Sequence, residues 1–307
     1  MRRFPACVMM TVVVPWTDQY TLDEGLFRDE IQALVSAGIT HLYIFGTAGE
    51  GYAVDDAGFQ LIARVFVDHM RALGAEPMIG VISLSQATIE RRIAFARDSL
   101  GVRLFQISLP SWGALEDELE LRTFFDRVLG RFDDCQFLHY NLQRAKRLVT
   151  ASEYAAIAGD HANLVATKNS TDSMQRVRDL LDRSASLQHF FGEQAFLYGS
   201  LVDQCGLLIS VASTNLAMGH RYFEAGRSRD LATLVRMEGE LREISRHLVA
   251  SGGDAQARID GAYDKVLWRL HDARFPLRLL PPYRGCDEAS ADGFAEFMRT
   301  RYPHWAP

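Results

Sequence analysis

Residues 163–170 read Asn-Leu-Val-Ala-Thr-Lys-Asn-Ser, a short apolar run that ends on a lysine. Apolar runs of this length between polar flanks are typical of buried β-strands. Lys168 stands at the exit of this strand, which is an unusual place because lysine is almost never fully buried without a partner. The segment therefore predicts a buried strand that presents an amine at its carboxyl end.

Lysine is rare in this chain. The sequence has 33 lysine and arginine residues, of which only Lys146, Lys168 and Lys265 are lysines. Arginine cannot replace an amine that must lose its proton and attack a carbonyl, because the guanidinium pKa is too high. Lys168 is therefore a candidate Schiff-base lysine. The alternative is a strand-end lysine that reaches solvent or an ion pair.

Strand and helix patterns alternate on both sides of this segment. Apolar and β-branched runs predict eight strands, at residues 8–14, 42–45, 77–82, 102–109, 135–140, 163–168, 189–191 and 207–211. Helical patterns lie between them, and Thr21, Ser85 and Thr150 stand where helix caps are expected. Eight strand–helix repeats predict a (β/α)8 TIM barrel. A doubly wound sheet is the alternative, but Pro15-Trp16 rather than GxGxxG follows the first strand.

The eighth repeat ends near Arg227. Three further helical patterns follow, at residues 230–248, 256–271 and 289–301, with prolines between the last two. We therefore expect a barrel domain at residues 1–227, which holds the active site, and a C-terminal helical bundle at residues 228–307 that packs on the barrel.

Charge and hydrophobicity exclude several classes of partner. The net charge is −6 and no block of lysine and arginine occurs, so a nucleic-acid partner is not expected. No apolar run approaches the ~20 residues of a membrane span. Residues 1–14 faintly resemble a signal peptide, but Pro15-Trp16-Thr17-Asp18 follows instead of a small-x-small cleavage site. We expect these residues to form the first strand of a cytoplasmic protein.

The cysteine and histidine spacings predict no metal site. The cysteines are far apart in the sequence and form no CxxC pair: Cys7, Cys135, Cys205 and Cys286. This spacing indicates neither a disulfide framework nor a zinc site, and free thiols suit a reducing cytosol. No HxH or HExxH motif stands at a strand end, which argues against a metal-dependent barrel enzyme.

Several polar residues follow predicted strands, and in a TIM barrel the carboxyl ends of the strands form the active site. The turn Gly46-Thr47-Ala48-Gly49-Glu50 could present backbone N–H groups to a carboxylate, or it could be a plain tight turn. Tyr140 precedes Asn141 at the end of the fifth strand. It could move protons beside an imine, or it could be a core residue with a solvated hydroxyl. Trp112 lies just beyond the fourth strand.

This combination resembles the dihydrodipicolinate synthase / N-acetylneuraminate lyase family of class I, pyruvate-dependent aldolases. The resemblance covers essentially the whole chain, including the helical tail. Each matching motif is weak alone, but together they occur in the family's order: Pro15, Gly46-Thr47-x-Gly49-Glu50, Tyr140-Asn141, Lys168 and Leu208-Ile209-Ser210.

The resemblance implies a role for each matching residue. Lys168 would form the imine with the keto carbon of pyruvate or another 2-keto acid, Tyr140 would donate and accept protons, and Thr47 would relay them. Thr47 and Ala48 would hold the substrate carboxylate through backbone N–H groups, and Ile209 would contact the keto acid through its carbonyl. No cofactor and no metal are implied. Enclosure in an apolar barrel mouth is expected to lower the pKa of Lys168.

Three departures from the family pattern concern the substrate. Ala48 replaces a second hydroxyl residue of the turn, and Trp112 replaces the tyrosine that completes the synthase's proton relay across a subunit interface. Arg144 stands in for the carboxylate-binding arginine only if a one-residue gap is allowed. Trp112 and Arg144 are still expected to bind substrate, and the resemblance implies a homotetramer built from tight dimers.

These observations predict a Schiff-base lyase, aldolase or dehydratase that acts on a 2-keto acid. Three alternatives within the family stay open: a genuine 4-hydroxy-tetrahydrodipicolinate synthase, a hydratase-aldolase and a 2-keto-3-deoxy sugar acid dehydratase. Outside enzymes, the alternative is a regulatory relative that binds a keto acid without turnover.

Overall fold

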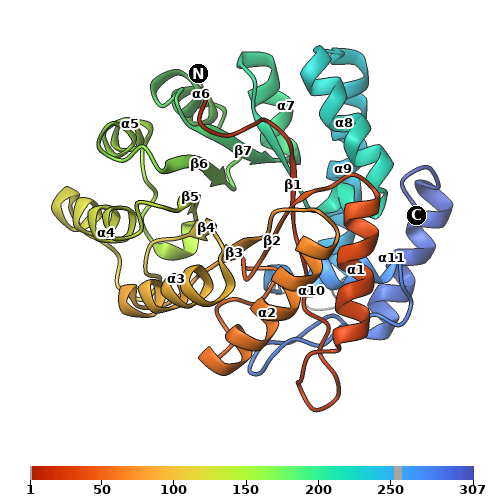
Figure 1. Cartoon of the computed structure of the whole chain (residues 1–307). Helices are drawn as coiled ribbons and strands as arrows, with labels where there is room; N and C mark the ends of the chain where they lie inside the picture. The colour runs from red at the N-terminus through yellow and green to blue at the C-terminus, as the bar shows by residue number, and fades with distance from the viewer. Residues whose placement is uncertain (1, 252–257) are drawn as a thin grey trace.

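The strands form a closed parallel barrel in the computed structural model, which describes residues 2–251 and 258–307. Each strand pairs with the next along the chain, and the last pairs with the first (Figure 1). The strands are β1 (Val8–Thr11), β2 (His41–Ile44), β3 (Met78–Gly80), β4 (Leu104–Ile107), β5 (Gln136–Asn141), β6 (Leu164–Asn169), β7 (Gln188–Gly192) and β8 (Gly206–Ile209). The predicted TIM barrel is confirmed.

Helices surround the strands and then continue beyond the barrel (Figure 1). The eight helices of the repeats are α1 (Glu24–Ser36), α2 (Asp56–Ala72), α3 (Gln86–Leu100), α4 (Glu118–Arg131), α5 (Ala151–Asp160), α6 (Met174–Arg183), α7 (Glu193–Val202) and α8 (Leu216–Ser228). Short 3-10 helices follow β5 and β8, at η1 (Gln143–Ala145) and η2 (Val211–Thr214). Among the described residues, no helix has the length and apolar content that crossing a bilayer requires.

Two of the three predicted helix caps are confirmed. Ser85 accepts a hydrogen bond from the third residue of α3, and Thr150 forms a reciprocal capping box at the start of α5. The cap predicted at Thr21 is wrong. The carboxylate of Asp23 caps α1 instead, because the Thr21 hydroxyl is 2.7 Å from the Thr17 hydroxyl in the preceding turn.

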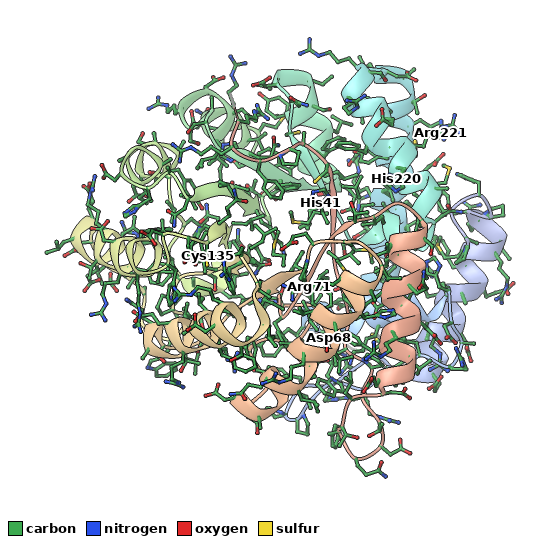
Figure 2. The ribbon with its side chains drawn as sticks, in the orientation of Figure 1. His41, Asp68, Arg71, Cys135, His220 and Arg221 are labelled. Carbon is green, nitrogen blue, oxygen red and sulfur yellow. The ribbon has the colours of Figure 1, made fainter. Side chains whose placement is uncertain are left out.

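The barrel interior is closed at the amino ends of the strands. Phe4 packs there, with its ring centroid 5.7 Å from that of His41 and 6.0 Å from that of Phe190. Figure 2 labels His41 at the start of β2. A cluster of buried side chains that includes Met9, Met78 and Leu138 fills the barrel above it. Among the described residues, these side chains fill the amino-end side of the barrel and leave the carboxyl ends of the strands for a ligand.

In the described part of the chain, three helices follow the barrel: α9 (Leu231–Ser251), α10 (Asp260–Arg269) and α11 (Glu288–Arg301). Helix α9 packs on α7 and α8, α11 packs on α9, and α10 packs on η2 beside the end of β8. The helix predicted at residues 256–271 begins in the structure at Asp260, and its first two predicted residues lie outside the described ranges. Helix α10 is thereby held over the open end of the barrel.

Candidate active site

Lys168 occupies the inside of the barrel near the exit of β6. Its backbone pairs with Tyr140 of β5 on one side and Phe190 of β7 on the other. The side chain is 4% exposed, and its Nζ donates a hydrogen bond of 2.8 Å to the Tyr43 hydroxyl on β2. The predicted lysine at the end of a buried strand is therefore confirmed as a structural feature.

Two tyrosine rings surround the Lys168 amine. Nζ lies 3.7 Å from the ring centroid of Tyr140 and 5.1 Å from that of Tyr43. A cation over an aromatic face is attracted by the ring quadrupole, and the attraction grows when water is excluded. The Tyr140 hydroxyl lies 3.3 Å from Ser170 Oγ. Tyr140 thus contacts the amine through its ring and turns its hydroxyl toward the loop after β6.

The expectation of a lowered Lys168 pKa is wrong. Burial is the largest single influence and lowers the pKa of this amine, but interactions with Tyr140, Tyr43 and Asp260 together leave the pKa above its ordinary value. The sequence argument considered only the apolar enclosure of the amine. It missed the second phenol, because Tyr43 lies within an apolar strand. The two phenols therefore favour the charged form of the amine, which must lose a proton before it can attack a carbonyl.

A cavity of about 560 Å³ opens above Lys168. Most of the predicted site residues line it together with Lys168: Thr47, Ala48, Tyr140, Arg144 and Ile209. Trp112 does not line this cavity. Its side chain is 77% exposed, and Lys146 Nζ hydrogen bonds to its backbone carbonyl at 2.9 Å. Within one chain, therefore, the structure brings six of the seven predicted site residues together and leaves Trp112 outside.

Glu50, the last residue of the glycine-containing turn, supports the site without facing it. Its carboxylate is fully buried and accepts hydrogen bonds of 2.7 Å from Trp16 Nε1, Lys265 Nζ and the backbone N–H of Leu280. A Cβ on Gly49 would lie 2.8 Å from a backbone nitrogen. The turn is therefore held rigidly from behind while the two residues before Gly49 face the cavity.

Two carboxylates at the cavity were not predicted, and both come from α10. Asp260 forms an ion pair of 3.0 Å with Arg144 at the mouth. Asp264 accepts a hydrogen bond of 3.2 Å from Ser210 Oγ, and burial, followed by the charge of Asp260, raises its pKa to about 7. No local pattern marks these two residues, because they reach the site only through the packing of α10 on the barrel.

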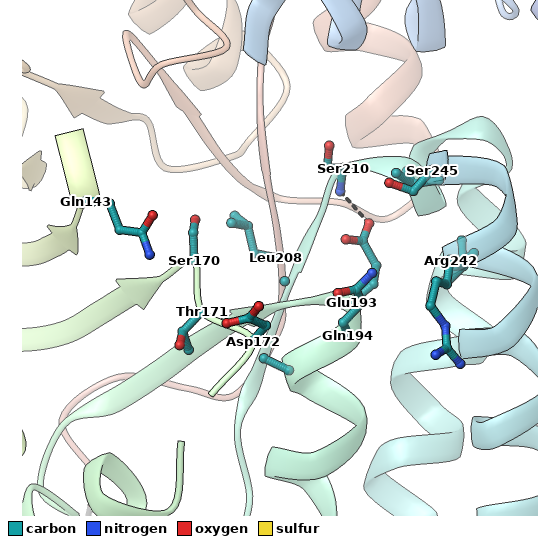
Figure 3. Close-up of a pocket in the computed structure, with 14 residues that line it drawn as sticks. Gln143, Ser170, Thr171, Asp172, Glu193, Gln194, Leu208, Ser210, Arg242 and Ser245 are labelled. Carbon is teal, nitrogen blue, oxygen red and sulfur yellow. Dashed lines mark hydrogen bonds between the residues drawn. The ribbon is translucent and has the colours of Figure 1, made fainter. Parts of the chain in front are cut away.

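A second cavity of about 480 Å³ adjoins the first, and Figure 3 shows the residues that line it. The loops after β6, β7 and β8 and one side of α9 enclose it, and both cavities are lined by Gln143, Ser170, Leu208 and Ser210. Glu193 holds the loop after β8, accepting hydrogen bonds from the backbone N–H groups of Ser210 (2.7 Å) and Ala212 (3.0 Å). Burial raises the pKa of the Glu193 carboxyl. The space above Lys168 therefore continues sideways, past β6 and toward α9.

No protein-family model matches the chain. A curated relative, the 4-hydroxy-tetrahydrodipicolinate synthase of Thermomicrobium roseum, is 25% identical over 247 residues, which cover 78% of each chain. Its similarity extends over most of the barrel and into the C-terminal helices.

Solved structures of the same fold cover nearly the whole chain. The YagE protein of E. coli K12, a member of the dihydrodipicolinic acid synthase family solved in complex with pyruvate, superposes with a TM-score of 0.81. It is 18% identical, and the alignment covers 96% of this chain and 97% of YagE. The N-acetylneuraminate lyase of Proteus mirabilis has a TM-score of 0.82 at 18% identity, with 97% and 99% covered. These likenesses establish the fold.

Proposed function

Because the chain is related in sequence to a 4-hydroxy-tetrahydrodipicolinate synthase and shares the fold of N-acetylneuraminate lyase, we propose that it is a Schiff-base-forming lyase. Its substrate is pyruvate or a longer 2-keto acid, and Lys168 is the residue that forms the imine. One observation carries the proposal: the Lys168 amine lies buried between two phenols at the base of a cavity of about 560 Å³.

The chemistry requires the amine to lose and regain protons. Lys168 gives up one proton and attacks the keto carbon, and that proton then returns to the carbinolamine hydroxyl, which leaves as water. The resulting iminium accepts the electron pair of a bond on the carbon next to it. A carbon–carbon bond to that carbon can therefore break, or a proton can leave from it. Tyr140 is the proposed proton carrier because its ring contacts the amine, and Thr47 lines the same cavity.

The carboxylate of the keto acid is proposed to bind at the turn after β2. Thr47 and Ala48 face the cavity there, and successive backbone N–H groups in such a turn form an anion-binding site. Ile209 faces the same cavity from the end of β8. These residues would hold the carboxylate and keto group while Lys168 attacks.

The substrate is proposed to be longer than pyruvate. The adjoining cavity of about 480 Å³ provides room for a tail, and its polar lining includes Gln143, Thr171 and Gln194. Arg144 and Asp260 stand at the mouth of the first cavity. A hydroxylated or acidic tail fits these groups better than an apolar one would.

Condensation of pyruvate with aspartate semialdehyde is not the proposed reaction. Ala48 has no hydroxyl, and Trp112 has no exchangeable hydroxyl and lies outside the cavity of its own chain. Lys168, Tyr140 and Thr47 suffice for cleaving or dehydrating a 2-keto acid. A homotetramer is proposed from the resemblance, and a cytoplasmic location from the four free cysteines.

The test is a panel of sugar-derived and aromatic 2-keto acids, with pyruvate release followed by a coupled assay. We expect release from at least one of them and weak or absent synthase activity. Robust synthase turnover together with no release from the panel would overturn the substrate assignment. Borohydride reduction in the presence of pyruvate separates an enzyme from a binding protein, because only an imine leaves a pyruvyl adduct in the intact mass.

A further inference from the structure

Tyr43 makes a close contact with the Lys168 amine, and the roles proposed above do not account for this contact. Its hydroxyl accepts a hydrogen bond of 2.8 Å from Lys168 Nζ, across the barrel from β2 to β6. The side chain is 1% exposed, yet it lines the cavity above the amine. A buried hydrogen bond to the charged group that must react is a strong constraint on that group.

The neighbouring turn leaves room for the Tyr43 ring. A Cβ on Gly46 would lie 2.6 Å from Tyr43 Cε2, so any other residue at position 46 would displace the ring. Tyr43 itself pairs with Thr11 of β1 and Met78 of β3, which fixes its backbone in the middle of the sheet. The phenol is therefore held in one position beneath the amine.

We propose that Tyr43 is a catalytic residue of this site, whose hydroxyl oxygen accepts the single N–H of the Lys168 iminium and fixes the orientation of the imine. The inference rests on the proposed function, because it concerns the same imine. It adds a second phenol with a task different from that of Tyr140.

The geometry follows from counting hydrogens on nitrogen. The ammonium ion carries three, the neutral amine two and the iminium one. If one N–H stays on Tyr43, the other N–H and the lone pair of the neutral amine share the two remaining directions, so the lone pair is free to face a keto carbon in the cavity. In the iminium the remaining N–H carries positive charge, and a buried charged N–H without an acceptor is strongly destabilised. Tyr43 supplies that acceptor throughout, without gaining or losing a proton.

The hydroxyl groups of Tyr43 and Tyr140 lie in different positions relative to the Lys168 amine. Tyr43 packs in the buried cluster that fills the barrel, and its oxygen accepts a hydrogen bond from Nζ. Tyr140 lays its ring against Nζ, and its hydroxyl lies 3.3 Å from Ser170 in the loop above. Tyr140 is therefore placed to reach substrate atoms in the cavity, whereas Tyr43 is placed to hold the nitrogen.

The test begins with the free protein. The chain has only three lysines, so carbon-13 labelling at lysine Cε gives three signals, and Lys168→Arg identifies one of them. The charged and titratable groups around Lys168 are Tyr43, Tyr140, Asp260, Asp264 and Arg144. Tyr43→Phe removes one group that favours the ammonium form, so the pKa of Lys168 should fall and imine formation should begin at lower pH.

The second readout is the rate of pyruvate trapping by borohydride near neutral pH, divided by the fraction of neutral Lys168 amine that the carbon-13 titration gives at that pH. Loss of a hydrogen bond to a charged group should slow trapping in Tyr43→Phe by about 10- to 100-fold. Tyr154→Phe is the matched control, because Tyr154 is equally buried and its hydroxyl makes one hydrogen bond, of 2.6 Å, to His139 outside the cavity. Its trapping rate and Lys168 pKa should match those of the wild type.

The outcomes separate the two proposals. If the wild type yields no pyruvyl adduct, the proposed function fails and this inference fails with it. If the wild type is trapped and Tyr43→Phe matches it in both rate and Lys168 pKa, only the role of Tyr43 is overturned. If Tyr43→Phe does not fold, 3-fluorotyrosine at position 43 provides the test. It keeps the shape of the ring but makes the neutral hydroxyl a weaker hydrogen-bond acceptor. Slower trapping would support the inference, and unchanged trapping would overturn it.

Discussion

Glu50 and Lys265 form a fully buried ion pair of 2.7 Å that joins the turn after β2 to helix α10. Burial lowers the pKa of Lys265 to about 8, although the charge of Glu50 acts in the opposite direction. The pair connects the two parts of the chain that form the site: the turn proposed to hold the substrate carboxylate, and the helix that places Asp260 and Asp264 over the barrel.

Removing one member of this pair should be costly. Lys265→Met leaves the Glu50 carboxylate buried without its cation, and we expect a loss of about 3–5 kcal/mol in the free energy of unfolding. Denaturant unfolding followed by circular dichroism measures it. The exposed Lys146→Met is the control and should lose less than about 1 kcal/mol. Equal losses in the two variants would show that the buried pair does not brace the fold.

The imine should form on Lys168 alone. Peptide mapping after reduction with pyruvate should place the adduct there, and Lys168→Arg should abolish trapping while the circular dichroism spectrum stays unchanged. Lys265 is the informative competitor, because its pKa is low but its amine is bound to Glu50. An adduct on Lys146 or Lys265 would refute the assignment.

Tyr140→Phe should affect turnover more than binding. The ring that packs on Lys168 remains, so pyruvate is still trapped, at a reduced rate. Turnover should fall by ~10²-fold or more, the usual effect of removing a positioned acid or base. Steady-state kinetics on a substrate identified from the panel, with trapping measured in parallel, separates the two effects. Unchanged turnover would mean that another group moves the proton.

Asp264 should make stability depend on pH. Burial raises its pKa from 3.8 to about 7, so between these values the folded protein keeps a proton that the unfolded chain has lost. The stability that this protonated carboxyl contributes to the folded protein is present in full below pH 3.8 and is lost as the pH rises toward 7. The free energy of unfolding of Asp264→Asn, measured by thermal unfolding, should therefore rise relative to that of the wild type as the pH rises through this window. We expect a relative rise of about 1–2 kcal/mol after allowance for partial solvent screening. Asp292→Asn, on the exposed side of α11, controls for the loss of one carboxylate. A constant difference between Asp264→Asn and the wild type would contradict the prediction.

Trp112 is proposed as an anchor between subunits. It is 77% exposed, and Leu119 in the first turn of α4 is 74% exposed, so two large apolar side chains of this region lack cover in the single chain. Light scattering should find a tetramer. The tetramer of Trp112→Ala should dissociate at a higher protein concentration than the tetramer of Met174→Ala, which changes an exposed residue on α6. A stable and active monomer would contradict the proposal.

The barrel could be predicted from the sequence because its signals are local. Apolar strand patterns and helical patterns alternate eight times, and the carboxyl ends of parallel strands must meet at one end of a closed barrel. That rule alone brought Thr47, Tyr140, Lys168 and Ile209 together. The cap of α1 was misplaced by two residues, because Thr21 forms its hydrogen bond within the preceding turn rather than with the helix.

The chemical environment of the amine was decided by tertiary structure. Tyr43 is separated from Lys168 by 125 positions, and its strand looks like any other apolar strand, so nothing in the sequence indicates that its hydroxyl meets the amine. Asp264 reaches the cavity only because α10 folds back over the barrel. The direction of the Lys168 pKa shift depends on atoms within a few ångströms of Nζ, and local sequence determines which residue carries the amine but not which side chains surround it.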